Sequence, residues 1–475
     1  MRYTIPKGFK LGANMPAWQV EGGMNKLEGH EHFPDLMYRA HPERWFQGYG
    51  PTRASEHYTH YEEDIKLLKA SGCQQVRFNP DWSRFIKDFE TGEVNEEEAA
   101  HYEKVIQCYI DNDIEPILCL EHWELPAYYY EHYDGYASRK VISMFVKYAE
   151  EIFKRYGHLV KHFFTFNEPI VIPQLCFMDG FWWPYGNNVK RAMNWIHGKI
   201  LASAKVVSLY HQMNLGGKIG IIINPAFIYE RSSDNPEDKK AKDIADSFYW
   251  GAFMDTAIKG EYPKQLLTIL EKEGCMFDYE EEDFNIIKNN TIDILGLNYY
   301  QPLRVKEAEY AWNDNNFHFK KYYSEWEMPG KRMNPYRGWE IYPKALYDAA
   351  MRIKNEYGNI EWIVAESGMG VENEQLYKDE DGVIQDDYRI EYIKEHLAWL
   401  FKAIDEGCNC VGYWLFAGMD NCSPLNAFKN RYGLIEVDLE HDRKRRLKKS
   451  ALFYNQTVQE QRFDYKDIDE DITIK

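Results

Sequence analysis

The chain has 475 residues, and 44% of them are hydrophobic, which is ample apolar surface for a buried core. This proportion excludes a largely disordered protein, because disordered segments bury too little surface to offset the entropy of the chain. The formal net charge is −19, from 57 Lys and Arg against 76 Asp and Glu. So acidic a protein is repelled by nucleic acid and by anionic lipid, so we expect neither nucleic acid nor membrane as a partner.

Short apolar runs alternate with longer amphipathic segments along the chain. The runs predict eight strands, over residues 9–14, 75–78, 116–120, 162–167, 218–224, 293–299, 361–366 and 409–416. Between the strands, hydrophobic residues at helical spacing predict helices that include 58–71, 95–111, 138–156 and 386–406. Asn95 and Ser138 stand where the N-caps of two of these helices are expected.

Eight repeats of strand, helix and strand indicate parallel βαβ units. The simplest arrangement is an α/β fold with a closed (β/α)8 barrel, the TIM barrel, with elaborated βα loops. We expect residues 1–475 to form this barrel as a single domain. A doubly wound open sheet is the alternative, and the lack of a GxGxxG sequence after the first strand counts against it.

In such a barrel, chemistry takes place at the carboxyl ends of the strands. Polar residues stand there after apolar strand bodies, and two of them are the carboxylic acids Glu168 and Glu366. A pair of this kind suits glycoside hydrolysis, in which one carboxyl group protonates the leaving oxygen and the other attacks the sugar. A single Glu at a strand end is usually only solvated, so spacing alone leaves both interpretations open. If they pair, Arg77 is expected to keep Glu366 ionised while Glu168 stays protonated.

Motifs around these residues resemble those of glycoside hydrolase family 1, the retaining β-glycosidases with a (β/α)8 barrel. The likeness extends from FKLGANMPAWQVEGG to RYGLIEVDLEHDRKRRLKKSALFYNQTV, nearly end to end. TFNEP resembles the acid/base motif, which implies that Glu168 is the acid/base. EWIVAESGMG resembles the nucleophile motif, which implies that Glu366 is the nucleophile.

The same resemblance implies roles for residues around the two acids. The nucleophile is positioned by Arg77 of VRFNPDWSRF and by Asn298 and Tyr300 of GLNYY. Sugar contacts are implied for Gln19, His122, Trp123, Asn167 and Phe416. Arg337 belongs to a loop that often contacts the leaving group in this family.

The sequence departs from the family pattern at two places near the site. The nucleophile motif usually reads T-E-N-G, and here Ser367 takes the place of Asn. Phe416 stands where the family usually carries the Trp on which the sugar stacks. These departures leave a non-catalytic sugar-binding barrel as an alternative, against which the retention of both acids and Arg77 argues.

Residues 420–433 read DNCSPLNAFKNRYG and bear on the substrate. Family members that act on plain sugars usually have D-N-x-E-W here, whereas this chain has Ser423 and Pro424. The 6-phospho-β-glycosidase branch is similar, with a Ser, a Lys and a Tyr that bind the 6-phosphate. A Glu at position 423 would repel a phosphate, which carries about −1.5 to −2 charges, whereas a Ser donates a hydrogen bond to it. Within that branch a Trp after the Ser accompanies galacto substrates, so the resemblance implies a gluco substrate for a chain with Pro424.

We therefore expect a phosphate site made of Ser423, Lys429, Arg431 and Tyr432. The match to the branch is offset by one residue. Some members carry the Lys two residues before the Tyr, where this chain has Asn430, and Lys429 lies one position earlier. The competing interpretation is that Lys429 and Arg431 are solvated loop charges. The predicted function is thus a retaining 6-phospho-β-glucosidase, with a β-glucosidase for non-phosphorylated sugars as the alternative.

Some features point away from other functions. The His pairs of the sequence lack zinc-site spacing, so we expect no metal, and the predicted chemistry needs no cofactor. The run RKRRLKK over 443–449 is interpreted as a solvated surface turn rather than a nucleic-acid patch. The start MRYTIPKGFKLG has no apolar segment of a signal peptide, so we expect a cytoplasmic protein with reduced cysteines. The sequence leaves the oligomeric state open, a homo-oligomer included.

Overall fold

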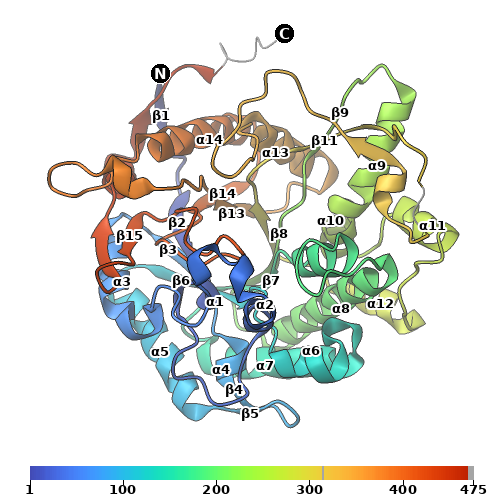
Figure 1. The fold of residues 1–475 in the computed structure, drawn as a ribbon, viewed down its shortest axis with the longest axis horizontal. Helices are drawn as coiled ribbons and strands as arrows, with labels where there is room; N and C mark the ends of the chain where they lie inside the picture. The colour runs from blue at the N-terminus through green and yellow to red at the C-terminus, as the bar shows by residue number, and fades with distance from the viewer. Residues whose placement is uncertain (313–314, 469–475) are drawn as a thin grey trace.

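The computed structural model describes residues 1–312 and 315–468. Its centre is a closed barrel of eight parallel strands, surrounded by helices (Figure 1). In chain order the strands are β2 (Lys10–Met15), β3 (Gln75–Phe78), β6 (Glu115–Glu121), β7 (His162–Asn167), β8 (Lys218–Ile223), β10 (Ile294–Asn298), β13 (Trp362–Ser367) and β14 (Cys410–Leu415). Each lies within one residue of its predicted ends, which confirms the (β/α)8 barrel and excludes the open sheet.

The barrel strands are apolar because both of their faces are buried. Inward-facing side chains fill the barrel: Ile117, Cys119, Phe164, Ile222, Ile294, Ile363, Ala365 and Trp414. The other face of each strand packs under the surrounding helices in a much larger apolar cluster. The barrel is therefore a packed core, and the chemistry has to take place at its rim.

The predicted helices are present as α3 (His57–Ala70), α5 (Glu96–Asp111), α7 (Arg139–Tyr156) and α14 (Asp387–Asp405). The predicted caps are confirmed, because Asn95 accepts a hydrogen bond from the Glu97 amide and Ser138 accepts one from the Lys140 amide. The remaining α-helices are α1 (Ala17–Val20), α2 (Phe33–Ala40), α4 (Trp82–Phe85), α6 (Ala127–Tyr133), α8 (Val189–Met213), α9 (Pro236–Tyr249), α10 (Gly251–Met254), α11 (Lys264–Lys272), α12 (Glu281–Asn289), α13 (Lys344–Glu356) and α15 (Lys449–Glu460). No helix among residues 1–312 and 315–468 is long and apolar enough to cross a membrane.

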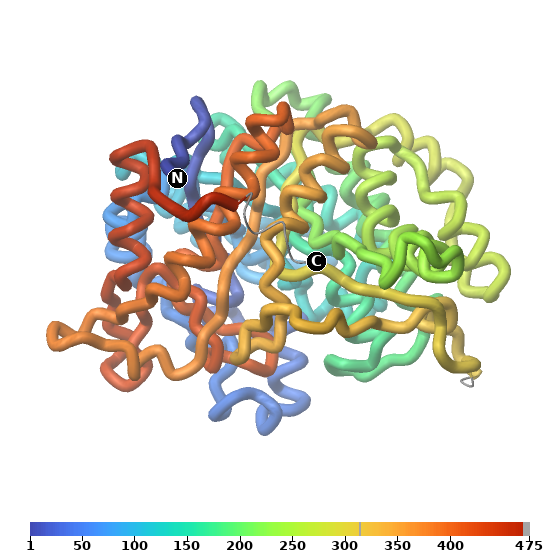
Figure 2. Tube along the Cα trace, turned by 90° about the horizontal axis from the view of Figure 1, so that it is seen from above, coloured from blue at the N-terminus to red at the C-terminus, as the bar shows by residue number. Residues whose placement is uncertain are grey.

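Small sheets elaborate the ends of the barrel. One contains β9 (Ile228–Glu230), β11 (Leu303–Glu307) and β12 (Tyr323–Glu325), and others pair β4 (Ile86–Asp88) with β5 (Glu93–Val94) and β15 (Ile435–Asp438) with β16 (Lys444–Leu447). The pair of β1 (Arg2–Thr4) and β17 (Arg462–Asp464) brings the first residues beside the C-terminal segment (Figure 2). These additions make the loops around the barrel rim larger than simple turns.

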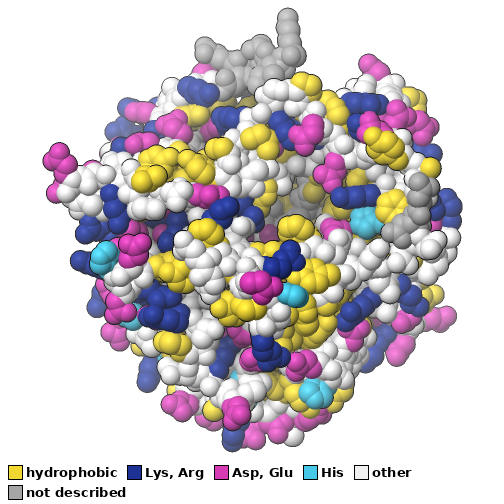
Figure 3. Space-filling view, in the orientation of Figure 1, with side chains coloured by type: hydrophobic (Ala, Val, Ile, Leu, Met, Phe, Trp, Pro, Cys, Tyr) yellow, Lys and Arg dark blue, Asp and Glu magenta, His cyan; other side chains and the backbone are white. Residues whose placement is uncertain are grey.

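The expected solvated turn over 443–449 is wrong. Residues 444–447 form β16, and Arg445 donates to Asp64 at 2.9 Å. Lys448 is fully buried, where its ammonium group contacts Glu374 and lies 2.7 Å from an oxygen of Asp420. Buried charges of this kind are retained only with partners of opposite sign, and these partners are distant in the sequence. On the surface, by contrast, charged side chains of both signs are interspersed across the face seen in Figure 3.

Candidate active site

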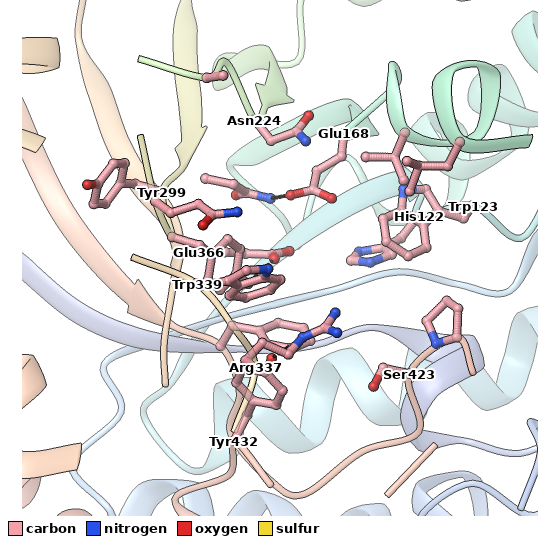
Figure 4. Close-up of a pocket in the computed structure, with 18 of the residues that line it drawn as sticks. His122, Trp123, Glu168, Asn224, Tyr299, Arg337, Trp339, Glu366, Ser423 and Tyr432 are labelled. Carbon is pink, nitrogen blue, oxygen red and sulfur yellow. Dashed lines mark hydrogen bonds between the residues drawn. The ribbon is translucent and has the colours of Figure 1, made fainter. Parts of the chain in front are cut away.

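A cavity of about 300 Å³ lies at the carboxyl ends of the barrel strands. Most of the predicted site residues line it: Gln19, His122, Trp123, Glu168, Asn298, Tyr300, Glu366, Phe416, Ser423 and Tyr432. Arg77 and Asn167 are fully buried and hydrogen-bond to members of this set. The structure therefore gathers residues from seven strands or the loops that follow them around one space (Figure 4).

The chain turns sharply where two of these residues leave their strands. Glu168 follows β7 with φ of +48°, and Trp123 follows β6 with φ of +75°. Residues other than glycine rarely adopt this left-handed backbone conformation, which costs of order 1–3 kcal/mol. The surrounding barrel holds both residues in it, and both side chains line the cavity.

Glu366 is held at both of its oxygens. The Arg77 guanidinium contacts Oε1, and the Tyr300 hydroxyl donates to Oε2 at 2.7 Å. Arg77 is itself fixed, because its Nε donates to Asn14 at 2.6 Å and its Nη1 donates to His122 Nδ1 at 2.7 Å. Burial and the Arg77 charge hold the pKa of His122 well below its usual range, so the ring is neutral and accepts that hydrogen bond.

Glu168 has weaker partners than Glu366. Asn298 Nδ2 donates to its Oε1 at 2.9 Å and to Asn167 Oδ1 at 3.1 Å. Burial and the negative charge of Glu366 raise the pKa of Glu168 to about 8. Burial raises the pKa of Glu366 as well, and the Arg77 cation and the Tyr300 hydroxyl offset only part of this increase. We conclude that the proton resides on Glu168 and the negative charge on Glu366.

Other polar atoms around the two acids have no partner within the described part of the chain. They include Gln19 Oε1, Trp123 Nε1 and Asn298 Oδ1, all buried. Buried polar groups in folded proteins are almost always hydrogen-bonded. These acceptors and this donor therefore suit a ligand that carries several hydroxyl groups.

The departures at Ser367 and Phe416 have different consequences. Ser367 is fully buried with its hydroxyl 3.2 Å from that of Tyr392, and it does not line the cavity. Phe416 lines the cavity and packs edge-on against Tyr300 and Tyr432, with ring centroids 6.2 and 5.2 Å apart. An aromatic face is thus present where the family carries Trp, with a smaller area.

Two of the four predicted phosphate ligands lie outside the cavity, so this part of the prediction is wrong. Ser423 and Tyr432 line it, whereas Lys429 and Arg431 line a neighbouring cavity. There Lys429 pairs with Glu372 at 3.1 Å, and Arg431 lies 3.5 Å from Asp420. The reason is geometric: Arg431 forms a β-bridge with Val371, and side chains of consecutive residues in extended backbone point to opposite sides.

Several residues that the sequence analysis did not assign also line the cavity: Val171, Leu175, Asn224, Pro225, Ala226, Gln301 and Trp339. Asn224 directly follows β8, so the strand-end rule could have found it. Pro225, Ala226 and Gln301 lie within three residues of strand ends, whereas Val171 and Leu175 belong to the helical segment after β7 and Trp339 to the loop of Arg337. They give one part of the cavity a more apolar wall.

Comparison with known proteins places this site in a family. The model of a family described as "Glycosyl hydrolase family 1" matches residues 1–463. The chain is 43% identical to "6-phospho-beta-glucosidase GmuD" of Bacillus subtilis, with coverage of 97% of this chain and 99% of that protein. It is 36% identical to a "6-phospho-beta-galactosidase" of Clostridium acetobutylicum, with coverage of 88% and 90%.

A solved structure agrees. The family 1 β-glucosidase from Thermotoga maritima superposes with a TM-score of 0.86 at 27% identity, over 96% of this chain and 99% of that one. The barrel, the paired acids at its rim and the match over almost the whole sequence lead to one conclusion. The chain belongs to glycosyl hydrolase family 1.

Proposed function

We propose that this protein is a retaining glycoside hydrolase that cleaves 6-phospho-β-glucosides. The observation that carries the proposal is the presence of Ser423 and Tyr432 in the same cavity as Glu168 and Glu366. Position 423 is where enzymes for plain sugars carry a Glu, and a carboxylate there would repel a phosphate. The 43% identity to a 6-phospho-β-glucosidase along the whole chain supports the same substrate.

In the proposed mechanism, ionised Glu366 attacks the anomeric carbon while Glu168 gives its proton to the leaving oxygen. A covalent glycosyl-enzyme forms, and the leaving group departs as an alcohol. Glu168, now ionised, takes a proton from water, whose oxygen attacks the same carbon and frees Glu366. The two steps together retain the β configuration, and Glu168 returns to its protonated state.

The neighbours of the two acids hold them ready for these steps. Arg77 and Tyr300 fix the plane of the Glu366 carboxylate, so that its attacking oxygen keeps one orientation. Asn298 holds Glu168, and sugar hydroxyls are bound by Gln19, His122, Trp123 and Asn167, with Phe416 beneath the ring. Burial raises the pKa of Tyr432, so its hydroxyl stays protonated and donates to the phosphate.

We extend the proposal to the whole molecule. Because residues on or after all eight barrel strands line the cavity or support a residue that does, we expect residues 1–475 to act as a single catalytic domain. All eight cysteines are free thiols, which supports a reducing compartment such as the cytoplasm.

The test compares p-nitrophenyl β-glucoside 6-phosphate with p-nitrophenyl β-glucoside on the purified protein. We expect kcat/KM to be at least about 100-fold higher for the phosphorylated substrate, since charged hydrogen bonds contribute about 1.5–3 kcal/mol each. Equal or better cleavage of the plain glucoside would instead identify a β-glucosidase. Failure to cleave either substrate would contradict the glycosidase itself, and Glu366→Gln should abolish both activities.

A further inference from the structure

The cavity that holds Ser423 and Tyr432 has one basic side chain. Arg337 is the only Lys or Arg among the described residues that line it. Its Nε donates to the Tyr432 hydroxyl at 3.2 Å, and its guanidinium carbon lies 4.4 Å from the centre of the Trp339 ring. Figure 4 shows Arg337, Tyr432 and Ser423 gathered at the same side of the pocket.

The charge of Arg337 is not compensated by a carboxylate within residues 1–312 and 315–468, in contrast to the two cations expected from the sequence. Lys429 and Arg431 already pair with Glu372 and Asp420, so a phosphate would have to compete with these carboxylates. Arg337 instead contacts a hydroxyl and an aromatic face. Its two Nη groups carry N–H donors in a planar fork, which matches the oxygens of a phosphate.

The loop that carries Arg337 is built to hold its shape. Asn334 is buried at the base of this loop. Its side-chain Nδ2 donates to the Gly370 carbonyl at 2.9 Å, and its Oδ1 accepts from the Tyr336 backbone amide at 3.0 Å. The backbone also closes the loop, because the Asn334 backbone amide donates to the Trp339 carbonyl at 2.7 Å. At the far end, Glu340 makes two hydrogen bonds with Arg304, at 2.9 and 2.7 Å. A cation on such a loop loses little freedom when it binds an anion.

Asn430 connects this loop to the segment that contains Tyr432. It lies two residues before Tyr432 in the chain. In this structure Asn430 is buried, and its amide lies 3.5 Å from the Tyr336 carbonyl, next to Arg337 in the chain. This contact joins the segment that carries Tyr432 to the backbone of the loop that carries Arg337.

We infer that Arg337 is the counter-ion of the substrate 6-phosphate and thereby determines the preference for phosphorylated glycosides. The inference rests on the proposed function. The phosphate lies between the Ser423 hydroxyl, the Tyr432 hydroxyl and the Arg337 guanidinium. Because Tyr432 accepts a hydrogen bond from Arg337 Nε, its own proton is directed elsewhere and is available to the phosphate.

The experiment measures kcat/KM for the phosphorylated and the plain p-nitrophenyl glucoside with wild type, Arg337→Met, Arg337→Lys and the control Lys429→Gln. For Arg337→Met we expect about a 100-fold loss on the phosphorylated substrate, mainly through KM, and less than about a threefold change on the plain one. Arg337→Lys should lie between Met and wild type, since it keeps the charge without the fork. Lys429→Gln removes a cation of the neighbouring cavity and should leave the ratio of the two substrates unchanged.

The outcomes separate the inference from the proposed function. A wild type that prefers the phosphorylated substrate, with an unchanged ratio in Arg337→Met, overturns the inference and leaves the function standing. Equal losses on both substrates also overturn it, because Arg337 would then act on the leaving group or on the loop. So does a loss in Lys429→Gln as large as in Arg337→Met. A wild type without preference refutes the phosphorylated substrate and the inference with it. The activity on the plain substrate reports that each variant is folded.

Discussion

Glu168 should make the protein less stable as the pH rises, and Glu168→Gln should relieve this effect. Burial and the charge of Glu366 raise the pKa of Glu168 from its ordinary 4.5 to about 8. Between these values the folded protein keeps the Glu168 proton and the unfolded chain loses it. The unfolded state then binds fewer protons, so the free energy of unfolding falls as pH increases.

The magnitude follows from the two pKa values. Each pH unit that lies well between the two pKa values lowers the free energy of unfolding by about 1.36 kcal/mol. From about pH 5 to about pH 7.5, Glu168 alone therefore lowers it by roughly 3 kcal/mol. A chain of 475 residues has an unfolding entropy of about 1 kcal/mol per kelvin near its melting temperature. The expected effect on Tm is therefore about 3 °C.

The assay is differential scanning calorimetry of wild type and Glu168→Gln at the two pH values and one scan rate. We expect the Tm advantage of Glu168→Gln to grow by about 3 °C from the lower to the higher pH. Glu63→Gln, on the exposed side of α3, is the matched control for the loss of one negative charge. An advantage that stays constant or shrinks as pH rises would refute the assignment of a raised pKa to Glu168.

Four further outcomes are expected. The kcat/KM of wild type should fall as pH rises through about 8, where Glu168 loses its proton, and a profile flat from about pH 6 to about pH 9 would contradict its role as acid. Ser423→Glu should lower kcat/KM for the phosphorylated substrate by about 1000-fold, from roughly 4 kcal/mol of repulsion at about 4 Å, and equal losses on the plain substrate would count against Ser423 as a phosphate ligand. Tyr300→Phe should lower kcat by about 10- to 100-fold with little change in KM, because it removes a hydrogen bond to Glu366; a pure KM effect in steady-state kinetics would argue otherwise. Lys448→Met should lower the free energy of unfolding by up to about 3–5 kcal/mol in denaturant titrations, since Glu374 and Asp420 each lose one of their buried cationic partners, and a change below about 1 kcal/mol would show that Lys448 is not needed.

The barrel was predictable because its signals are local. Each strand is buried on both faces and therefore reads as a short apolar run, and caps such as Asn95 and Ser138 lie directly beside the helices that they begin. The acids Glu168 and Glu366 were found in the same way, as polar residues at the ends of such runs. Their expected roles came from the surrounding motifs TFNEP and EWIVAESGMG, which are also local in the sequence.

The cations could not be assigned from local signals. Lys448 looks solvated in a basic run, and its burial follows from Asp420 and Glu374, which the fold brings to it from distant segments. Arg337 lies almost a hundred positions before Tyr432 in the chain, and only the folded loop places their side chains 3.2 Å apart. The side on which Arg431 lies depends on its bridge to Val371, which the sequence does not encode in any short pattern.

The alternation of Arg431 and Tyr432 across that bridge has a consequence for how substrate choice can change within this fold. The two neighbours serve different cavities, one charged and one aromatic. A shift of one residue in the register of this bridge would exchange their destinations. The Arg431 guanidinium would then face the bound sugar, and the Tyr432 ring would lie in the neighbouring cavity, although no residue had been substituted. The register of this bridge, as well as residue identity, is thus a variable that evolution or an engineer can use to tune specificity here.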